Sequence, residues 1–221
     1  MATSLQHHWD AKYDTDLTGT KFSWSQSTPA LSLELIRELA SEATELKVVD
    51  AGGGLSSLAL DLVRGAAGCA VEATVIDISG KALEANKARL TEAEREKGLV
   101  TWIHSNILEA PMTAASTDIW HDRAVFHFLT SESEQKQYIE LVSRVVKPNG
   151  VAIIATFDED GGPTRCSDLD VKRWSVAQLA TAFGGEFDLE RGEKEDHITP
   201  SGKVQKFVYA ILRRRSDKLS E

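Results

Sequence analysis

The chain has 221 residues, 42% of them hydrophobic and 27% charged, which is typical of one globular domain with a substantial core. Its formal net charge of −9 argues against a nucleic-acid partner, because binding to a phosphate backbone needs a basic face. Two cysteines, Cys69 and Cys166, are too few for a disulfide framework or a zinc cluster. No run approaches the ~20 apolar residues of a membrane span, and residues 1–13 contain no apolar stretch of signal-peptide length. We therefore expect a cytoplasmic protein with no membrane partner.

Two short runs could suggest a function but do not support one, and the arginine run is interpreted as a solvated chain end. The run Arg213-Arg214-Arg215 is the only candidate for a basic patch, and it lies where a final strand meets a polar tail. The pair His7-His8 lacks further metal ligands at suitable spacing. The sequence therefore predicts no metal site.

The predicted elements alternate between helix and strand along the chain. Thr28-Pro29 is typical of an N-cap followed by proline at the first helical position. Ser79 is predicted to cap a helix that continues to Lys97 and stops at Gly98, and Ser131 to Glu134 fits the capping-box pattern of a later helix. The predicted strands cover residues 47–50, 73–77, 100–104, 117–120, 151–157, 186–190 and 206–212, and the last two are expected to pair antiparallel.

Residues 158–173 form a long polar stretch without helical or strand periodicity. Loops of this length in a compact domain tend to be functional or mobile, so a substrate-side loop is expected there. Residues 147–150 predict a turn before it, and Ser175 begins a short helix that ends at Gly184-Gly185. No repeat or domain boundary is evident, and the sequence predicts a single domain over residues 1–221.

The most informative segment is the glycine run Gly52-Gly53-Gly54. It follows a short apolar strand that ends in Asp50 and precedes residues with helical apolar spacing. Glycines let a ligand lie on the backbone, and a strand, glycine turn and helix in succession are typical of a nucleotide site in an α/β sheet. About 23 residues after Gly54, a second strand ends in Asp77, where a carboxylate can accept hydrogen bonds from both ribose hydroxyls.

Five βα units followed by an antiparallel hairpin do not fit a plain dinucleotide-binding domain. From about Trp9 to about Arg213, the order of elements resembles the class I S-adenosylmethionine-dependent methyltransferases. The resemblance implies a Rossmann-like three-layer sandwich, with a seven-stranded, mostly parallel sheet and one antiparallel strand near the edge. It also implies S-adenosyl-L-methionine as cofactor and S-adenosyl-L-homocysteine as product.

The resemblance assigns residues to the cofactor one by one. Asp50, Gly52 and Gly54 match the family's glycine motif and would hold the methionyl part, although Ser56 stands where a third glycine is common. Asp77 matches the ribose-binding acid. The remaining cofactor-binding residues that the resemblance implies are Ile78 and Asn106 near the adenine, Ile107, His121 and Trp24.

The segment after the fourth strand is similar to small-molecule S-methyltransferases of the thiopurine and thiol type. It contains Asp122-Arg123-Ala124 followed by an apolar run with His127. It is also similar to bacterial methyltransferases of unassigned substrate, and more distantly to lysine methyltransferases. Residues 1–30, with Trp9, Tyr13 and Trp24, resemble the aromatic N-terminal cap of these relatives.

Asp122, Arg123 and His127 are the candidate catalytic residues. Asp122 or His127 could remove a proton from a thiol or amine acceptor, and Arg123 could orient an anionic or polar acceptor. Each residue also has a structural interpretation: Asp50 as a helix cap, His121 and His127 as packed core residues, and Asp122 and Arg123 as a mutual ion pair. The aromatic residues of the cap could likewise be hydrophobic staples.

The sequence leaves several functions open. A small molecule is the first choice of methyl acceptor, a protein lysine is the second, and the oligomeric state is not predicted. A nicotinamide-dependent oxidoreductase is disfavoured, because none of the tyrosines is followed by lysine in a Tyr-x-x-x-Lys pair. A catalytically silent methyltransferase-like protein that binds the cofactor is the non-enzymatic alternative.

Overall fold

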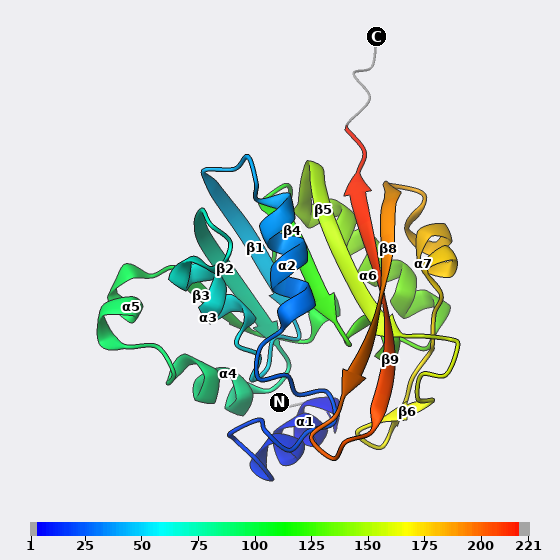
Figure 1. Ribbon diagram of the computed structural model, residues 1–221, viewed down its shortest axis with the longest axis horizontal. Coiled ribbons are helices and arrows are strands. Elements are labelled where there is room, and N and C mark those ends of the chain that lie inside the picture. Colours follow the sequence, from blue (N-terminus) through cyan, green and yellow to red (C-terminus); the bar gives the residue numbers. More distant parts are fainter. Residues whose placement is uncertain (1–3, 217–221) are drawn as a thin grey trace. The chain divides into compact units, whose positions relative to one another are not determined.

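A computed structural model describes residues 4–216 of the protein (Figure 1). It divides into two compact units, each described by itself. The first unit consists of Met1–Ala110 and His197–Val204, and the second of Pro111–Asp196 and Gln205–Glu221. Residues 1–3 of the predicted N-terminal cap lie outside the described part of the chain.

Seven of the described strands form one sheet, in the order β3 (Val100–His104), β2 (Ala70–Asp77), β1 (Glu45–Ala51), β4 (Thr117–Arg123), β5 (Val146–Phe157), β9 (Val204–Arg214) and β8 (Phe187–Ile198). The pairs β1–β2, β2–β3 and β4–β5 are parallel, while β5 and β9 pair antiparallel. The predicted fold class, a mostly parallel Rossmann-like sheet with one antiparallel strand near the edge, is confirmed.

In the first unit, three parallel strands bring two carboxylates to one end of the sheet. Asp50 and Asp77 lie at or near the carboxyl ends of β1 and β2, where Asp50 pairs with Val75 and Asp77 with His104. Buried apolar residues on β2, α3 and α4, among them Val75 and Leu83, form part of the core. The elements of this unit are α1 (Ser4–Asp14), α2 (Ala30–Leu39), β1 (Glu45–Ala51), α3 (Leu58–Asp61), the wide helical turn η1 (Leu62–Ala66), β2 (Ala70–Asp77), α4 (Gly80–Lys87), α5 (Glu92–Lys97), β3 (Val100–His104) and the 3₁₀ turn η2 (Ile107–Glu109).

The predicted helix from Ser79 to Lys97 is wrong, because two helices occupy that range. Ser79 caps α4 as expected, since its hydroxyl accepts from the Ala82 N–H. Thr91 then caps α5 in a reciprocal capping box with Glu94, and Gly98 ends α5 in the left-handed conformation. The Thr91-x-x-Glu94 pattern, a local start signal, interrupts the helix that apolar spacing alone predicts.

Other boundaries also differ from the prediction. Pro29, not Thr28, occupies the cap position of α2, and no side chain there accepts a hydrogen bond from the helix. The predicted turn at residues 147–150 is an irregularity within β5, with Asn149 at φ 63°. Helix α1 was not expected from the sequence.

The second unit surrounds its strands with aromatic core residues. Its largest buried side chains include Trp120, Tyr138, Phe126, Phe157 and Phe207. The elements are β4 (Thr117–Arg123), the 3₁₀ turn η3 (Phe126–Phe128), α6 (Glu132–Val145), β5 (Val146–Phe157), β6 (Arg165–Cys166), β7 (Leu169–Asp170), α7 (Val176–Phe183), β8 (Phe187–Ile198) and β9 (Val204–Arg214). The tip of the β8–β9 hairpin belongs to the first unit.

The polar stretch 158–173 is more regular than its sequence indicates. It contains the short antiparallel hairpin of β6 and β7, with Ser167 and Asp168 at positive φ in the turn. The Arg173 guanidinium donates to the Gly162 carbonyl at 3.2 Å, and the Val171 N–H donates to the Thr164 carbonyl at 3.1 Å. These bonds give the stretch a defined conformation within the second unit.

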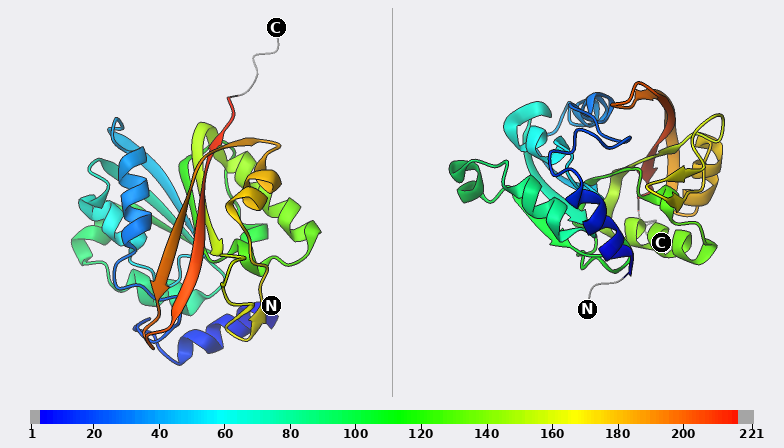
Figure 2. Two further views of the ribbon diagram at one scale, coloured as in Figure 1. Left: turned by 45° about the vertical axis from the view of Figure 1, so that its right-hand side comes forward. Right: turned by 90° about the horizontal axis from the view of Figure 1, so that it is seen from below.

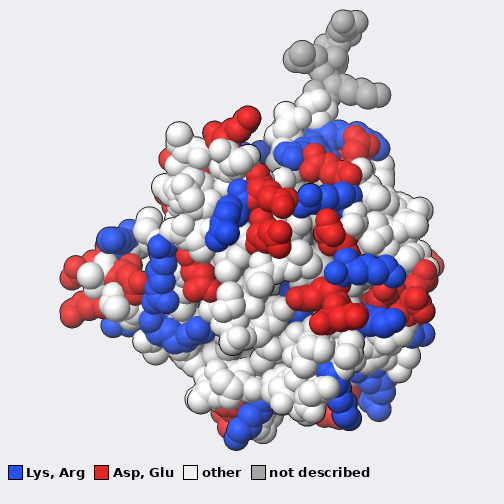
Figure 3. Space-filling view, viewed as in Figure 1, with Lys and Arg blue, Asp and Glu red and all other residues white. Residues whose placement is uncertain are grey.

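The arginine run at the end of β9 is bound to neighbouring groups. Arg213 pairs with Glu190, Arg215 pairs with Asp188, and Arg214 donates to the Val146 carbonyl. Basic and acidic side chains are correspondingly interspersed on the face seen in Figure 3. The run therefore pairs with neighbouring groups, and Arg213 and Arg214 belong to β9 rather than to a solvated chain end. Among residues 4–216, no helix is both long and apolar enough to cross a membrane.

Candidate functional site

The glycine turn, residues 52–57, follows the carboxyl end of β1. Gly52 and Gly54 have φ values of 66° and 44°, a backbone region that other residues seldom adopt. A Cβ on Gly53 would lie 2.6 Å from Val75 Cγ1 and 2.8 Å from Asp50 Oδ2. A Cβ on Gly54 would overlap the Tyr13 hydroxyl and lie 3.3 Å from Asp77 Oδ2. The turn therefore requires glycine at both positions, and it brings the backbone close to two carboxylates.

Asp77 is a buried carboxylate held by backbone donors. Its Oδ1 accepts from the Ser79 N–H at 2.8 Å, and the Gly54 N–H also donates to its carboxylate. Burial raises the pKa of Asp77 to about 6, since the two N–H donors offset only part of the desolvation. Near pH 7 the side chain is still predominantly a carboxylate, ready to accept further hydrogen bonds.

An aromatic cap lies over this end of the first unit. Its members, Trp9, Tyr13, Phe22 and Trp24, come from α1 and the segment that follows, and they pack with Leu55 and Ala82. Phe22 and Trp24 stack at 4.7 Å, and Trp9 meets Trp24 edge-on. In Figure 2, α1 (dark blue) lies at the lower end of the first unit in the left view and faces the viewer in the right view, which is seen from below.

Polar contacts fix α1 against α4. Asp10 accepts from the Ser79 hydroxyl at 2.6 Å, and Asp14 pairs with Lys81. These bonds come from one face of α1 and hold the aromatic cap beside the glycine turn.

The predicted adenine-side residues lie nearby in the same unit. The backbone carbonyl of Ile78 lies 3.0 Å from His104 Nε2, and its side chain is half-buried. Asn106 Oδ1 accepts from the Leu108 N–H and thereby caps η2, while Ile107 is buried. Asn106 thus has a structural role, and its amide oxygen retains a second lone pair for a ligand donor.

These residues fit a cofactor built from adenosine and methionine. Asp77 can accept from the ribose hydroxyls, and the side-chain-free surface of Gly54 leaves room beside that carboxylate. Asp50, 4% exposed, lies at the other end of the turn. Eight of the predicted cofactor-binding residues belong to the first unit: Asp50, Gly52, Gly54, Asp77, Ile78, Asn106, Ile107 and Trp24.

The remaining candidates lie in the second unit. Asp122 is fully buried at the end of β4, where Oδ1 accepts from the Val125 N–H at 2.8 Å. Its Oδ2 accepts from the Phe126 N–H at 3.0 Å and from the Tyr138 hydroxyl. Burial raises the pKa of Asp122 to about 6 despite these donors. The carboxylate therefore organises the turn after β4.

Arg123 has partners on the two C-terminal strands. Its Nε donates to the Tyr209 hydroxyl at 3.0 Å, and its Nη2 lies 3.2 Å from Glu195 Oε2. Tyr209 donates to the same Glu195 oxygen at 2.9 Å, and the guanidinium lies over the Phe207 ring. Burial, followed by the Glu195 charge, raises the pKa of Tyr209 against the opposing effect of Arg123, so this hydroxyl stays protonated. The Arg123 charge is thus balanced within the unit.

His127 differs from Asp122 and Arg123, the other two catalytic candidates of this unit, in its hydrogen bonding. Its side chain is fully buried, and both ring nitrogens lack a hydrogen-bond partner within residues 4–216. The ring stacks on Phe157 at 4.5 Å and meets Phe128 edge-on. Burial, reinforced by the Arg123 charge, lowers its pKa to about 3, so the ring is neutral at pH 7. His121 is also buried, on β4.

Three hydrogen-bond contacts of Asp122 and Arg123 were not predicted from the sequence. Tyr138, on α6, donates to Asp122. Glu195 and Tyr209 bind Arg123 from 72 and 86 residues away, and only the register of the β8–β9 hairpin could have indicated them. No group of metal ligands occurs within the described part of the chain.

Comparisons with known proteins identify the family. The family model described as a methyltransferase domain matches residues 42–201. A search of curated proteins found no match.

Solved structures share the fold at low identity. An S-adenosylmethionine-dependent methyltransferase from Methanosarcina mazei is 15% identical, with a TM-score of 0.63, and the match covers 79% of this chain and 94% of that one. A Burkholderia thailandensis 1,6-didemethyltoxoflavin N1-methyltransferase, solved with 1,6-didemethyltoxoflavin and S-adenosylhomocysteine, is 16% identical, with a TM-score of 0.70 and coverages of 96% and 88%. The [4+2]-cyclase SpnF is also 16% identical, with a TM-score of 0.69 and coverages of 98% for both chains.

The predicted family, enzyme class and cofactor are therefore confirmed, while the site residues and the acceptor stay predictions. The chain belongs to the methyltransferase domain family and is an S-adenosylmethionine-dependent methyltransferase.

Proposed function

We propose that the protein moves a methyl group to a nucleophilic sulfur, nitrogen or oxygen atom of a small molecule. The cofactor-binding part of this proposal rests on the buried Asp77 carboxylate beside Gly54, in a turn with no room for a side chain. The small acceptor of the Burkholderia thailandensis neighbour supports the acceptor half.

The proposed chemistry is a metal-independent in-line displacement. When bound, S-adenosylmethionine supplies a methyl group on a positively charged sulfur, which leaves as a neutral thioether and needs no Lewis acid. The protein aligns the reactants, excludes water and, where the acceptor requires it, removes a proton.

The proposed cofactor residues divide by the part that they hold. Asp50, Gly52 and Gly54 would hold the methionyl part, and Asp77 would accept from the ribose hydroxyls. The proposed contacts to the rest of the cofactor are Ile78, Asn106, Ile107, His121 and Trp24. The cap formed by residues up to 30 would exclude water, and residues 158–173 are the proposed substrate-side loop.

The three acceptor-side candidates have different proposed roles. Asp122 shapes the turn after β4, because both of its oxygens already accept hydrogen bonds. Arg123 contacts a polar rather than an anionic acceptor, since Glu195 balances its charge. His127 is the proposed base, because neither ring nitrogen is bonded within the described chain. Its pKa of about 3 makes it a weak base, which suits only an acceptor that ionises readily.

The test begins with calorimetric titration of the purified protein. S-adenosylmethionine and S-adenosylhomocysteine are expected to bind with about micromolar affinity, whereas NAD is not. The Asp77→Ala variant should lose both sulfur ligands. If the wild-type protein binds neither sulfur ligand, or binds only NAD, the proposed cofactor site is contradicted.

An acceptor screen then separates small molecules from proteins. Thiols, amines and phenols are incubated with the cofactor beside lysine-containing peptides, and methylated products are identified by mass spectrometry. Methylation of peptides alone would favour a protein lysine acceptor. Cofactor binding without any methylated product would favour the catalytically silent alternative.

A further inference from the structure

Three consecutive carbonyl groups of the glycine turn are bound by side chains of the segment after β2. Asn86 Nδ2 donates to the Gly54 and Ser56 carbonyls, each at 2.9 Å. Arg89 Nη1 donates to the Leu55 carbonyl between them, also at 2.9 Å. These donors lie 30 to 34 residues after the turn in the sequence, so α4 and its end act on the turn from outside it.

Asn86 and Arg89 also fix each other. Asn86 is 1% exposed, and its Oδ1 accepts from Arg89 Nη1 at 3.2 Å. This bond assigns the amide oxygen toward Arg89 and directs the amide nitrogen to the two turn carbonyls. Because a buried amide with its donors and acceptor satisfied is costly to rearrange, the pair holds the turn in one conformation.

The direction of the carbonyls determines the direction of the N–H groups. In a trans peptide, the carbonyl of one residue and the N–H of the next point to opposite sides. Binding of the Gly54, Leu55 and Ser56 carbonyls therefore turns the following N–H groups away from Asn86 and Arg89. One of these, the Ser56 N–H, closes the turn on the Gly53 carbonyl at 2.7 Å.

A second observation indicates that the turn presents polar groups to a ligand. The residue Ser57 is 8% exposed, and its hydroxyl has no hydrogen-bond partner in the described part of the chain. A buried hydroxyl without a partner is unfavourable unless a ligand or water completes it.

We propose that Asn86 and Arg89 are positioning residues of the cofactor site, which hold the glycine turn in its ligand-binding conformation. The inference rests on the proposed assignment of the glycine turn to S-adenosylmethionine. Neither residue needs to touch the cofactor, because both act through the turn carbonyls.

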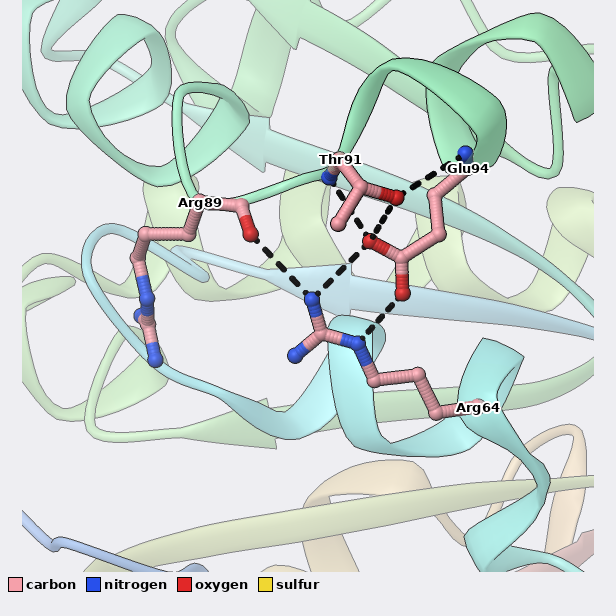
Figure 4. A network of polar contacts seen from close by, with 4 residues as sticks. All are labelled: Arg64, Arg89, Thr91 and Glu94. Carbon is pink, nitrogen blue, oxygen red and sulfur yellow. Dashed lines mark hydrogen bonds and ion pairs between the residues drawn. The ribbon is translucent and has the colours of Figure 1, made fainter.

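The surroundings of Arg89 provide a matched control. Arg64 Nη2 donates to the Arg89 backbone carbonyl at 3.1 Å, and Arg64 pairs with Glu94 at 2.7 Å (Figure 4). Glu94 also accepts from Thr91 at the start of α5. Arg64 thus stabilises the same region without contacting a turn carbonyl.

The test compares Asn86→Ala and Arg89→Met with Arg64→Gln. S-adenosylhomocysteine affinity is measured by calorimetry, amide hydrogen exchange at residues 54–57 is followed in the ligand-free protein, and melting temperature reports stability. We expect both site variants to bind about tenfold more weakly and to exchange faster at the turn, since each loses one or two hydrogen bonds that fix it. Arg64→Gln should lower the melting temperature while leaving affinity and turn exchange unchanged.

The outcomes separate this inference from the site assignment. Unchanged affinity and exchange in folded Asn86→Ala and Arg89→Met would overturn the positioning role while leaving the cofactor site intact. If Asn86→Ala fails to fold, Arg89→Met tests the positioning role by itself, because Arg89 is exposed and its substitution is expected to leave the fold intact. If wild-type protein does not bind S-adenosylhomocysteine, the site assignment and the positioning role both fail.

Discussion

The glycine turn of the first unit and the end of β4 in the second unit use polar groups in opposite ways. At the glycine turn, side chains bind the carbonyls from one side, and the Ser57 hydroxyl has no hydrogen-bond partner within the described chain. At the end of β4, Asp122 and Arg123 are each bound by groups of their own unit. We propose that the polar groups of the first region serve the cofactor, whereas the hydrogen bonds of the second region fix its own conformation.

The largest effect on the difference between the two regions is expected from a substitution at Gly54. In Gly54→Ala, the new Cβ would overlap the Tyr13 hydroxyl and crowd Asp77, at a φ of 44° that alanine seldom adopts. We expect S-adenosylhomocysteine affinity to fall by at least about a hundredfold, because the turn must move to relieve this crowding. Calorimetry measures the loss.

Gly98→Ala is the matched control for this substitution. Gly98 has φ 63° at the end of α5, and a Cβ there meets nothing within 4 Å. It should cost about 1 kcal/mol of stability and leave affinity unchanged. Equal losses of affinity in both variants would mean that the Gly54 effect is general strain.

The two regions also differ in how far the sequence could predict them. Asp50, the glycines and Asp77 lie within one strand-turn-helix-strand segment, so their convergence follows from local periodicity and parallel pairing. The partners of Arg123 depend on the pairing of β5, β8 and β9, which fixes side-chain neighbours across 72 and 86 residues. Propensity and spacing do not encode such contacts. For the same reason, the sequence predicts Asn86 only as a helix residue and not as a hydrogen-bond donor to the carbonyls of the glycine turn.

The second-largest effect is expected at Asp122. Asp122→Ala would leave the Val125 and Phe126 N–H groups and the Tyr138 hydroxyl without their acceptor in a buried site. The free energy of unfolding should fall by about 2 to 4 kcal/mol, while S-adenosylhomocysteine affinity stays the same. Urea denaturation measures the change.

Asp118→Ala is the control, because Asp118 also lies on β4 but pairs with the partly exposed Lys147. It should cost less than about 1 kcal/mol. An Asp122→Ala protein of normal stability that no longer turns over an identified acceptor would instead assign Asp122 a direct part in the reaction.

The pH dependence of cofactor binding tests whether Asp77, in the first region, binds the cofactor as a carboxylate. Burial raises the pKa of Asp77 to about 6, and only the ionised carboxylate can accept from both ribose hydroxyls. Affinity for S-adenosylhomocysteine should therefore be nearly constant above about pH 7, be halved near pH 6 and fall by about tenfold per pH unit below about pH 5. Calorimetry between pH 4.5 and about 7.5 tests this window. Asp77→Asn should bind weakly with no such dependence, and the same slope in that variant would assign the titration to another group.

The smallest expected effect concerns His127, the one candidate in the second region whose ring nitrogens are unpartnered in the described structure. Its pKa is lowered to about 3 by burial, whereas the unfolded chain has an ordinary histidine that is protonated below about 6.5. The unfolded state therefore binds an extra proton as the pH falls, and stability present above pH 6.5 is progressively lost toward pH 3.

His127→Leu removes this pH-dependent loss of stability and places an apolar side chain beside Phe128 and Phe157. At pH 5.5, relative to pH 7.5, the wild type should lose about 1 kcal/mol more unfolding free energy than the variant. The exposed His7→Leu should follow the wild type, and parallel pH profiles for all three proteins would show that His127 is charged inside the fold. If His127 is also the base, the leucine variant will combine improved acid stability with reduced turnover of an acceptor that must lose a proton, and this combination distinguishes a buried functional histidine from a packing residue.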